Sequence, residues 1–185
     1  MPDLRILGID PGTNALGYAI LDIDSKKLVV RELNVYHLPR NASHQKKLHF
    51  IFTYLEKLIE TYQPSQMAIE APFYGKNVQS MLKLGRAQGV AIAAALTKKL
   101  LVSEYSPKKI KVAITGNGNA SKEQVAAMLD QIISNRIETS SLDATDALAA
   151  AVCHHFQKKN GRLEVPQYKD WSSYINANPH HLKKG

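Results

Sequence analysis

Residues 8–21, GIDPGTNALGYAIL, determine how the rest of the chain is interpreted. An apolar run leads into Asp10, a Pro-Gly pair follows, and a second apolar run begins a few residues later. This order predicts two antiparallel strands, over residues 4–10 and 15–23, joined by a short loop. A carboxylate at the end of an apolar strand is costly to bury unless a positive group meets it. Asp10 is therefore either a turn residue or a ligand.

The composition limits the class of protein. A chain of 185 residues is long enough for one domain with a buried core. Its 24 Lys and Arg against 16 Asp and Glu give a net charge of +8. This charge favours nucleic acid as a partner over an anionic membrane, because the chain has no long basic amphipathic helix. The sequence contains no run long enough to cross a membrane and no signal peptide. We therefore expect a cytoplasmic protein with no membrane partner.

The remaining pattern predicts a mixed α/β domain over residues 1–160 and a polar tail over residues 161–185. Apolar spacing predicts a third strand at 28–36, a helix at 43–62, strands at 66–70 and 101–105, and helices at 77–100, 122–134 and 142–158. The first three strands form an antiparallel meander. The basic stretch 107–111 is assigned to no helix or strand.

The helix at 77–100 has almost no bulk in its middle, where glycine and alanine predominate from residue 85 to residue 95. Small side chains let another backbone approach closely. The pattern is compatible with tight packing on the chain's own sheet and with a helix-to-helix contact in a dimer. Both interpretations stay open at this point.

Four acids have informative positions in this basic chain. Asp10 and Glu70 each end a predicted strand, and Asp143 and Asp146 open the last helix three residues apart, so they share a face. The first and fourth strands of a mixed sheet can be neighbours, which would bring Asp10 beside Glu70. Each acid alone also has an ordinary structural role, as a turn residue, a strand end or a helix start.

If the last helix packs at that edge, four carboxylates converge and repel one another unless cations lie among them. Mg²⁺ prefers oxygen ligands, with water and substrate phosphate completing its shell. Two such ions about 4 Å apart can clamp the attacking and leaving oxygens of a phosphodiester. The four acids together therefore predict a magnesium site that hydrolyses phosphodiesters.

Four segments together resemble the RuvC family of bacterial Holliday junction resolvases. They are GIDPGTNALGYAIL (8–21), MAIEAPFYGKN (67–77), LKLGRAQGVAIAAA (82–95) and LDATDALAAAVCHH (142–155), in the family's order and approximate spacing. The resemblance covers about residues 4–157. It implies a ribonuclease H-like fold, with a five-stranded mixed sheet flanked by helices. It also implies a homodimeric, Mg²⁺-dependent endonuclease that nicks two strands of like polarity at a four-way DNA junction, in recombination and repair.

The resemblance also implies roles for single residues. Asp10, Glu70, Asp143 and Asp146 match the family's four catalytic, metal-binding acids, which implies two Mg²⁺ per subunit, with Mn²⁺ able to substitute. Phe73 matches an aromatic residue that stacks near the junction centre. The expected DNA-binding lysines and arginine are Lys83, Arg86, Lys108, Lys109, Lys111 and Lys122; of these, Lys111 and Lys122 resemble basic residues near the scissile phosphate, and Lys108 and Lys109 could equally be solvated charges. A branch-migration helicase complex is a further expected partner.

Two other readings remain. One is a YqgF-type ribonuclease H-like nuclease that acts on RNA, because Asp-Pro-Gly-Thr occurs in that family too. The other is a junction-binding module in which the acids are purely structural. Sugar kinases and actin-like ATPases share a similar first loop, but they need a second domain and a second phosphate loop, for which 185 residues leave no room.

Overall fold

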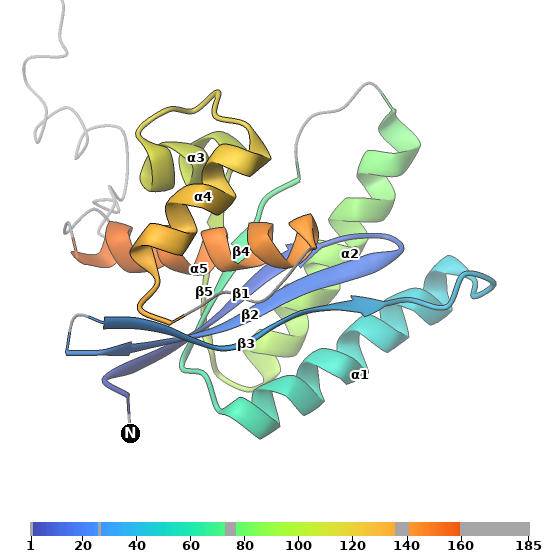
Figure 1. Ribbon diagram of the computed structural model, residues 1–185. Coiled ribbons are helices and arrows are strands. Elements are labelled where there is room, and N and C mark those ends of the chain that lie inside the picture. The colour runs from blue at the N-terminus through green and yellow to red at the C-terminus, as the bar shows by residue number, and fades with distance from the viewer. Residues whose placement is uncertain (1, 26, 73–76, 136–140, 160–185) are drawn as a thin grey trace, which may run out of the picture.

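The computed structural model describes residues 2–25, 27–72, 77–135 and 141–159. Within these residues, five strands form one sheet in the order β3-β2-β1-β4-β5, with helices on both faces (Figure 1). The strands are β1 (Leu4–Pro11), β2 (Ala15–Asp24), β3 (Lys27–His37), β4 (Gln66–Glu70) and β5 (Leu101–Tyr105). The helices are α1 (His44–Tyr62), α2 (Val78–Thr97), α3 (Pro107–Thr115), α4 (Lys122–Ile132) and α5 (Leu142–Lys159).

The topology places the ends of β1 and β4 side by side. β1, β2 and β3 pair antiparallel as a meander, and β4 pairs parallel to β1 after the α1 crossover, with Ile9 opposite Ile69. The predicted neighbourhood of the first and fourth strands is therefore confirmed. Asp10 and Glu70 follow this pair on adjacent strands.

Strand alternation sends these two carboxylates to one face of the sheet. Leu7 and Ile9 of β1 belong to the core that packs beneath α1 and α2, whereas Ile6 belongs to the core beneath α5. Side chains two residues apart on a strand share a face. Asp10 therefore lies on the α5 face, and the same alternation along β4 places Glu70 there.

The helix α3 was missed from the sequence, where residues 107–111 were assigned to no element. Ser106 caps its first turn by accepting a hydrogen bond from the Lys109 amide (3.3 Å), Pro107 occupies the first turn, and Gly116 ends the helix in the left-handed conformation (φ 74°). These are standard start and stop signals of a helix. For α4 the predicted capping box of Ser121 and Gln124 is present.

The small residues of α2 divide between two faces of the helix. Ala87, Ala91, Ala94 and Ala95 are buried against the sheet, which confirms the packing interpretation. Gly85 and Gly89 lie on another face, where an added Cβ would meet nothing within 4 Å. The same helix exposes the apolar side chains Val78, Leu82 and Leu96.

None of the helices in the described ranges combines the length and the hydropathy needed to cross a membrane.

Candidate active site

Two glycines in the sheet allow α5 to lie directly on it. A Cβ at Gly8 would come within 2.1 Å of the Ala147 carbonyl oxygen, and a Cβ at Gly17 within 2.1 Å of the Asp143 carbonyl oxygen. Gly17 also pairs with Asp10 across the β1–β2 ladder. Because Gly8 and Gly17 have no Cβ, the first turn of α5 can lie next to Asp10.

This close approach gathers the predicted acids. One carboxylate oxygen from each of Asp10, Asp143 and Asp146 lies within 4.8 Å of the other two. Glu70 lines a cavity of about 210 Å³ together with Asp10 and Asp146. Asp10, Asp143 and Asp146 therefore come together as the sequence predicted, and Glu70 lies in the same cavity but outside this 4.8 Å set.

Burial and mutual repulsion raise the pKa of two of the acids. Burial raises the pKa of Asp10 to about 7, with further contributions from the negative charges of Asp146 and Asp143. Burial also raises the pKa of Glu70 to about 8, assisted by Asp10 and Asp146. Desolvation and like charges both disfavour the ionised forms, so the cluster needs positive charge to be ionised at neutral pH.

Two lysines supply part of that charge. Lys122, in the first turn of α4, donates a hydrogen bond to Oδ2 of Asp146 and lines the same cavity. Burial alone would lower the pKa of Lys122, but the ion pair with Asp146 and the nearby Asp10 outweigh it and raise the pKa. Lys111 of α3 lines the cavity as well, and its positive charge partly opposes the rise in the pKa of Glu70.

The other predicted DNA contacts lie elsewhere. Lys109 sits over the ring of Tyr105, 5.1 Å from its centroid, and Lys108 is exposed on the same helix α3. Lys83 and Arg86 are exposed on α2, where Lys83 lines a separate cavity. Phe73 lies outside the described residues.

Several lining residues were not identified from the sequence. Pro107 and Ile110 of α3 and Val125 of α4 form the apolar wall of the acidic cavity. Recognition of α3 from its Ser-Pro start would have pointed to the first two. The roles of Gly8 and Gly17 had no comparable local signal, because the backbone that they admit belongs to a distant helix.

The acidic cavity suits a hard divalent cation. Carboxylate oxygens of Asp10 and Asp146 on its wall and of Asp143 beside it lie within 4.8 Å of one another, and ligand oxygens of one Mg²⁺ lie at most about 4.2 Å apart. Small rotations of these side chains would shorten the distances between their oxygens to those of a Mg²⁺ coordination shell. The raised pKa values of Asp10 and Glu70 fit the same conclusion, since the cluster accommodates added positive charge.

Comparisons with known proteins agree with this geometry. Residues 6–154 match the family model described as crossover junction endodeoxyribonuclease RuvC. The chain is 53% identical to the protein of that name from Cytophaga hutchinsonii, over 98% of this chain and 89% of the relative. It is 50% identical to the one from Christiangramia forsetii, over 96% of this chain and 92% of the relative.

Among solved structures, the Thermus thermophilus RuvC in complex with a Holliday junction substrate superposes with a TM-score of 0.80 at 26% identity. The match covers 86% of this chain and 97% of that one. The predicted ribonuclease H-like fold, with a five-stranded mixed sheet between helices, is thereby confirmed. The acids on adjacent strand ends, the helix laid over Gly8 and Gly17, and a family match over most of the length give one conclusion: this chain belongs to the RuvC family.

Proposed function

We propose that this chain resolves four-way DNA junctions by paired, symmetric nicks, with Asp10, Glu70, Asp143 and Asp146 as its catalytic metal ligands. As a RuvC family member it is a crossover junction endodeoxyribonuclease, and the solved relative from Thermus thermophilus binds a Holliday junction substrate. The observation that carries the proposal is the convergence of carboxylates from β1, β4 and α5 beside two lysines in one cavity.

The four acids would hold Mg²⁺, with Mn²⁺ as a substitute and two ions per subunit. When bound, these ions lower the pKa of a water molecule and neutralise the charge that develops on the phosphate oxygens. Lys111 and Lys122 bind the phosphate at the mouth of the cavity and position it without reading sequence. The water molecule would attack the phosphorus in line with O3′. The P–O3′ bond then breaks, which leaves a 5′-phosphate and a 3′-hydroxyl.

The functional unit that we propose is a homodimer joined through α2. Its outer face combines the open positions at Gly85 and Gly89 with the exposed side chains of Val78, Leu82 and Leu96. Such a face supports close packing of the same helix from a second copy. A twofold dimer suits a nearly twofold junction, since it directs two active sites to two symmetric strands. Phe73 in the segment before α2 is proposed to stack at the junction centre.

Further expectations follow from this assignment. Lys83, Arg86, Lys108 and Lys109 are proposed DNA contacts outside the acidic cavity. A branch-migration helicase complex is a proposed partner, the cytoplasm is the proposed location, and residues 161–185 are a proposed accessory tail.

The deciding experiment incubates the protein with a mobile four-way DNA junction and with a linear duplex, with Mg²⁺ and with a chelator. We expect ligatable, paired nicks in the junction only, and only with Mg²⁺. Asp10→Asn should bind the junction but cut it about three orders of magnitude more slowly, because it removes a metal ligand. Asp130→Asn, an exposed acid on α4, is the matched control and should cut at the wild-type rate.

Three results would redirect the proposal. Cleavage by Asp10→Asn at the wild-type rate would mean that the metal ligands are assigned wrongly. Binding of the junction without nicks would indicate a junction-recognition protein. Preferential nicking of RNA would favour a YqgF-type nuclease.

A further inference from the structure

A second polar cavity lies on the other side of the strand that carries Asp10. It has a volume of about 300 Å³, and its walls come from the loop between β1 and β2, the start of α1 and the first turn of α2. These three segments meet at one end of the molecule (Figure 1). We call it the Lys47–Lys83 cavity; its lining residues are Thr13, Asn14, Ala42, His44, Lys47, Ser80 and Lys83.

The charge of this cavity is positive without local compensation. Lys47 and Lys83 both line it, and no Asp or Glu occurs in residues 11–21, 33–55 or 71–103, the stretches that contribute its walls. The acidic cavity, by contrast, has three carboxylates on its walls. An anion could therefore bind in the Lys47–Lys83 cavity directly, whereas in the acidic cavity a cation must lie between the anion and the carboxylates.

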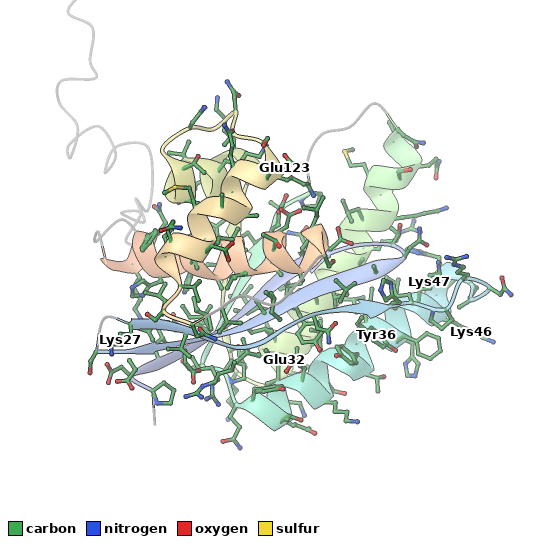
Figure 2. All side chains as sticks on the ribbon, in the orientation of Figure 1. Lys27, Glu32, Tyr36, Lys46, Lys47 and Glu123 are labelled. Carbon is green, nitrogen blue, oxygen red and sulfur yellow. The ribbon has the colours of Figure 1, made fainter. Side chains whose placement is uncertain are left out.

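The donors are held in place for an anion. Nζ of Lys47 donates a hydrogen bond to Oδ1 of Asn14 (2.8 Å), which fixes the ammonium group at the wall. Figure 2 shows Lys47 at the N-terminal end of α1. The first turns of α1 and α2 both contribute to the walls, and the dipoles of both helices add positive potential at those ends.

His44 also lines the cavity, and it brings a polar atom without a partner in the part of the chain that the structure describes. Its Nε2 atom is buried and has no hydrogen-bond partner among the described residues. Burial lowers the pKa of His44, and the positive charges of Arg86, Lys83 and Lys47 lower it further. A buried polar atom without a partner is costly, and an anion with bridging water would satisfy it.

The position of the cavity identifies the anion. Thr13 follows Asp10 by three residues, so their Cα atoms lie no more than about 11 Å apart. Phosphates of one DNA strand recur about every 3.4 Å along the helix axis. A DNA strand bound at the acids therefore has backbone phosphates close enough to reach Thr13 at the Lys47–Lys83 cavity within a few nucleotides.

From these contacts we infer that the Lys47–Lys83 cavity binds one backbone phosphate of the DNA, a few nucleotides from the phosphate that is cut. The inference rests on the proposed junction nuclease function. The lysine ammonium groups and the Thr13 and Ser80 hydroxyls supply the hydrogen bonds. Because the site contains no carboxylate, it holds DNA whether or not metal is bound at the acids.

The first test compares two double variants with the same loss of charge. Lys47→Met with Lys83→Met removes both cations of the cavity; Lys27→Met with Lys57→Met removes two exposed lysines that do not line it. Figure 2 shows Lys27 at the opposite end of the molecule from Lys47. Binding of a four-way DNA junction is measured in chelator over a range of salt concentrations.

We expect the cavity variant to bind the junction about tenfold more weakly than the control variant. The slope of log affinity against log salt should fall by about one, the value for one lost phosphate contact. Equal unfolding temperatures for the two variants establish that the loss is not a folding defect.

The second test locates the phosphate. Neutral methylphosphonates replace single phosphates, one at a time, along the junction strands on either side of the branch point. In the wild-type protein one of these positions should weaken binding, and the same substitution should have no further effect in the Lys47→Met with Lys83→Met variant. Additive losses at every position would overturn the inference.

The two proposals fail separately. If wild-type protein cuts junctions while the cavity variant binds like its control, the cavity inference is wrong and the proposed function stands. If wild-type protein binds junctions but cuts neither DNA substrate with Mg²⁺, the proposed nuclease function is wrong, and the methylphosphonate positions still decide the phosphate site.

Discussion

At the residue scale, Gly17 is the position at which the active site is most sensitive to a single methyl group. Gly17→Ala would put a Cβ at 2.1 Å from the Asp143 carbonyl oxygen, so the first turn of α5 must move away from Asp10. Overpacking of this kind costs about 1–3 kcal/mol. We expect junction cleavage to fall by more than tenfold while cooperative unfolding is retained.

The comparison that isolates this effect is Gly118→Ala. The three atoms nearest to a Cβ there belong to the side chains of Lys108 and Val112, so the substitution does not press on the backbone of α5. Cleavage rates and unfolding temperatures of both variants are measured together. Wild-type cleavage by Gly17→Ala would show that the contact with α5 does not set the catalytic geometry.

His154 makes stability depend on pH. It is buried between Tyr105, whose hydroxyl lies 2.8 Å from Nδ1, and Gln66, whose Oε1 lies 2.8 Å from Nε2. Burial, with the charges of Lys158 and His155, lowers its pKa to about 4. A histidine in the unfolded chain titrates near 6.5, so between these values the unfolded state takes up a proton that the folded state does not.

The free energy of unfolding should therefore fall as the pH is lowered from about 6.5 to about 4, by up to about 3 kcal/mol from this group. His154→Asn keeps one donor and one acceptor but cannot titrate, so that part of the slope should disappear. Urea unfolding across this pH range measures it. The exposed His49→Asn variant should keep the wild-type slope, and an unchanged slope in His154→Asn would refute the assignment.

The positions of the acids in the fold could be predicted because their signal is local. Asp10 and Glu70 each end an apolar strand, and Asp143 and Asp146 open a helix. The roles of Gly8 and Gly17 could not be predicted, because a glycine inside a strand can mark a bulge, a bend or the close approach of another backbone. Only the packing of α5 shows which one applies.

At the element scale, α2 presents an outer face that we propose to be the dimer interface. Gly89→Leu would fill the space above Gly89, where nothing lies within 4 Å in the single chain. The side chain fits the monomer but blocks close approach of a second α2. We expect sedimentation velocity at micromolar concentration to change from dimer to monomer.

A control for this experiment is Gln131→Leu, an apolar substitution at an exposed position of α4. It should sediment like the wild type. A wild-type protein that sediments as a single chain, or a Gly89→Leu variant that remains dimeric, would contradict the α2 interface.

Element prediction was accurate where an apolar run or an apolar period was clear. The ends of β4 and β5 agree with the prediction, and α1 begins one residue late at His44. The helix α3 was missed because it spans only 9 residues and buries just Ile110 and Ile114, which is too short a pattern for a helical period. Its Ser106 and Pro107 were the informative signal.

At the scale of the whole molecule, the acid cluster couples metal binding to folding. Burial, and to a smaller degree charge repulsion, makes the ionised forms of Asp10 and Glu70 unfavourable in the metal-free protein. Mg²⁺ that binds only the folded state at about 100 times its dissociation constant adds about 2.7 kcal/mol. For a domain of this size we expect the unfolding temperature to rise by roughly 5–10 °C relative to chelator.

Potassium chloride at matched ionic strength controls for general screening and should give a smaller rise. In Asp10→Asn the response to Mg²⁺ should weaken, because one ligand is lost. An identical rise in wild type and Asp10→Asn would show that Mg²⁺ acts away from the acidic cavity.

The helix α5 is both a catalytic element and the centre of one core. Asp143 and Asp146 stand in its first turns, while Ala147, Leu148 and Ala150 behind them are fully buried. The amides of these residues can meet deuterium only when the core itself opens. Hydrogen exchange at Ala147, Leu148 and Ala150, directly behind the catalytic acids, should thus be as slow as that of the central strands, so the helix that carries both acids unfolds only together with the whole domain.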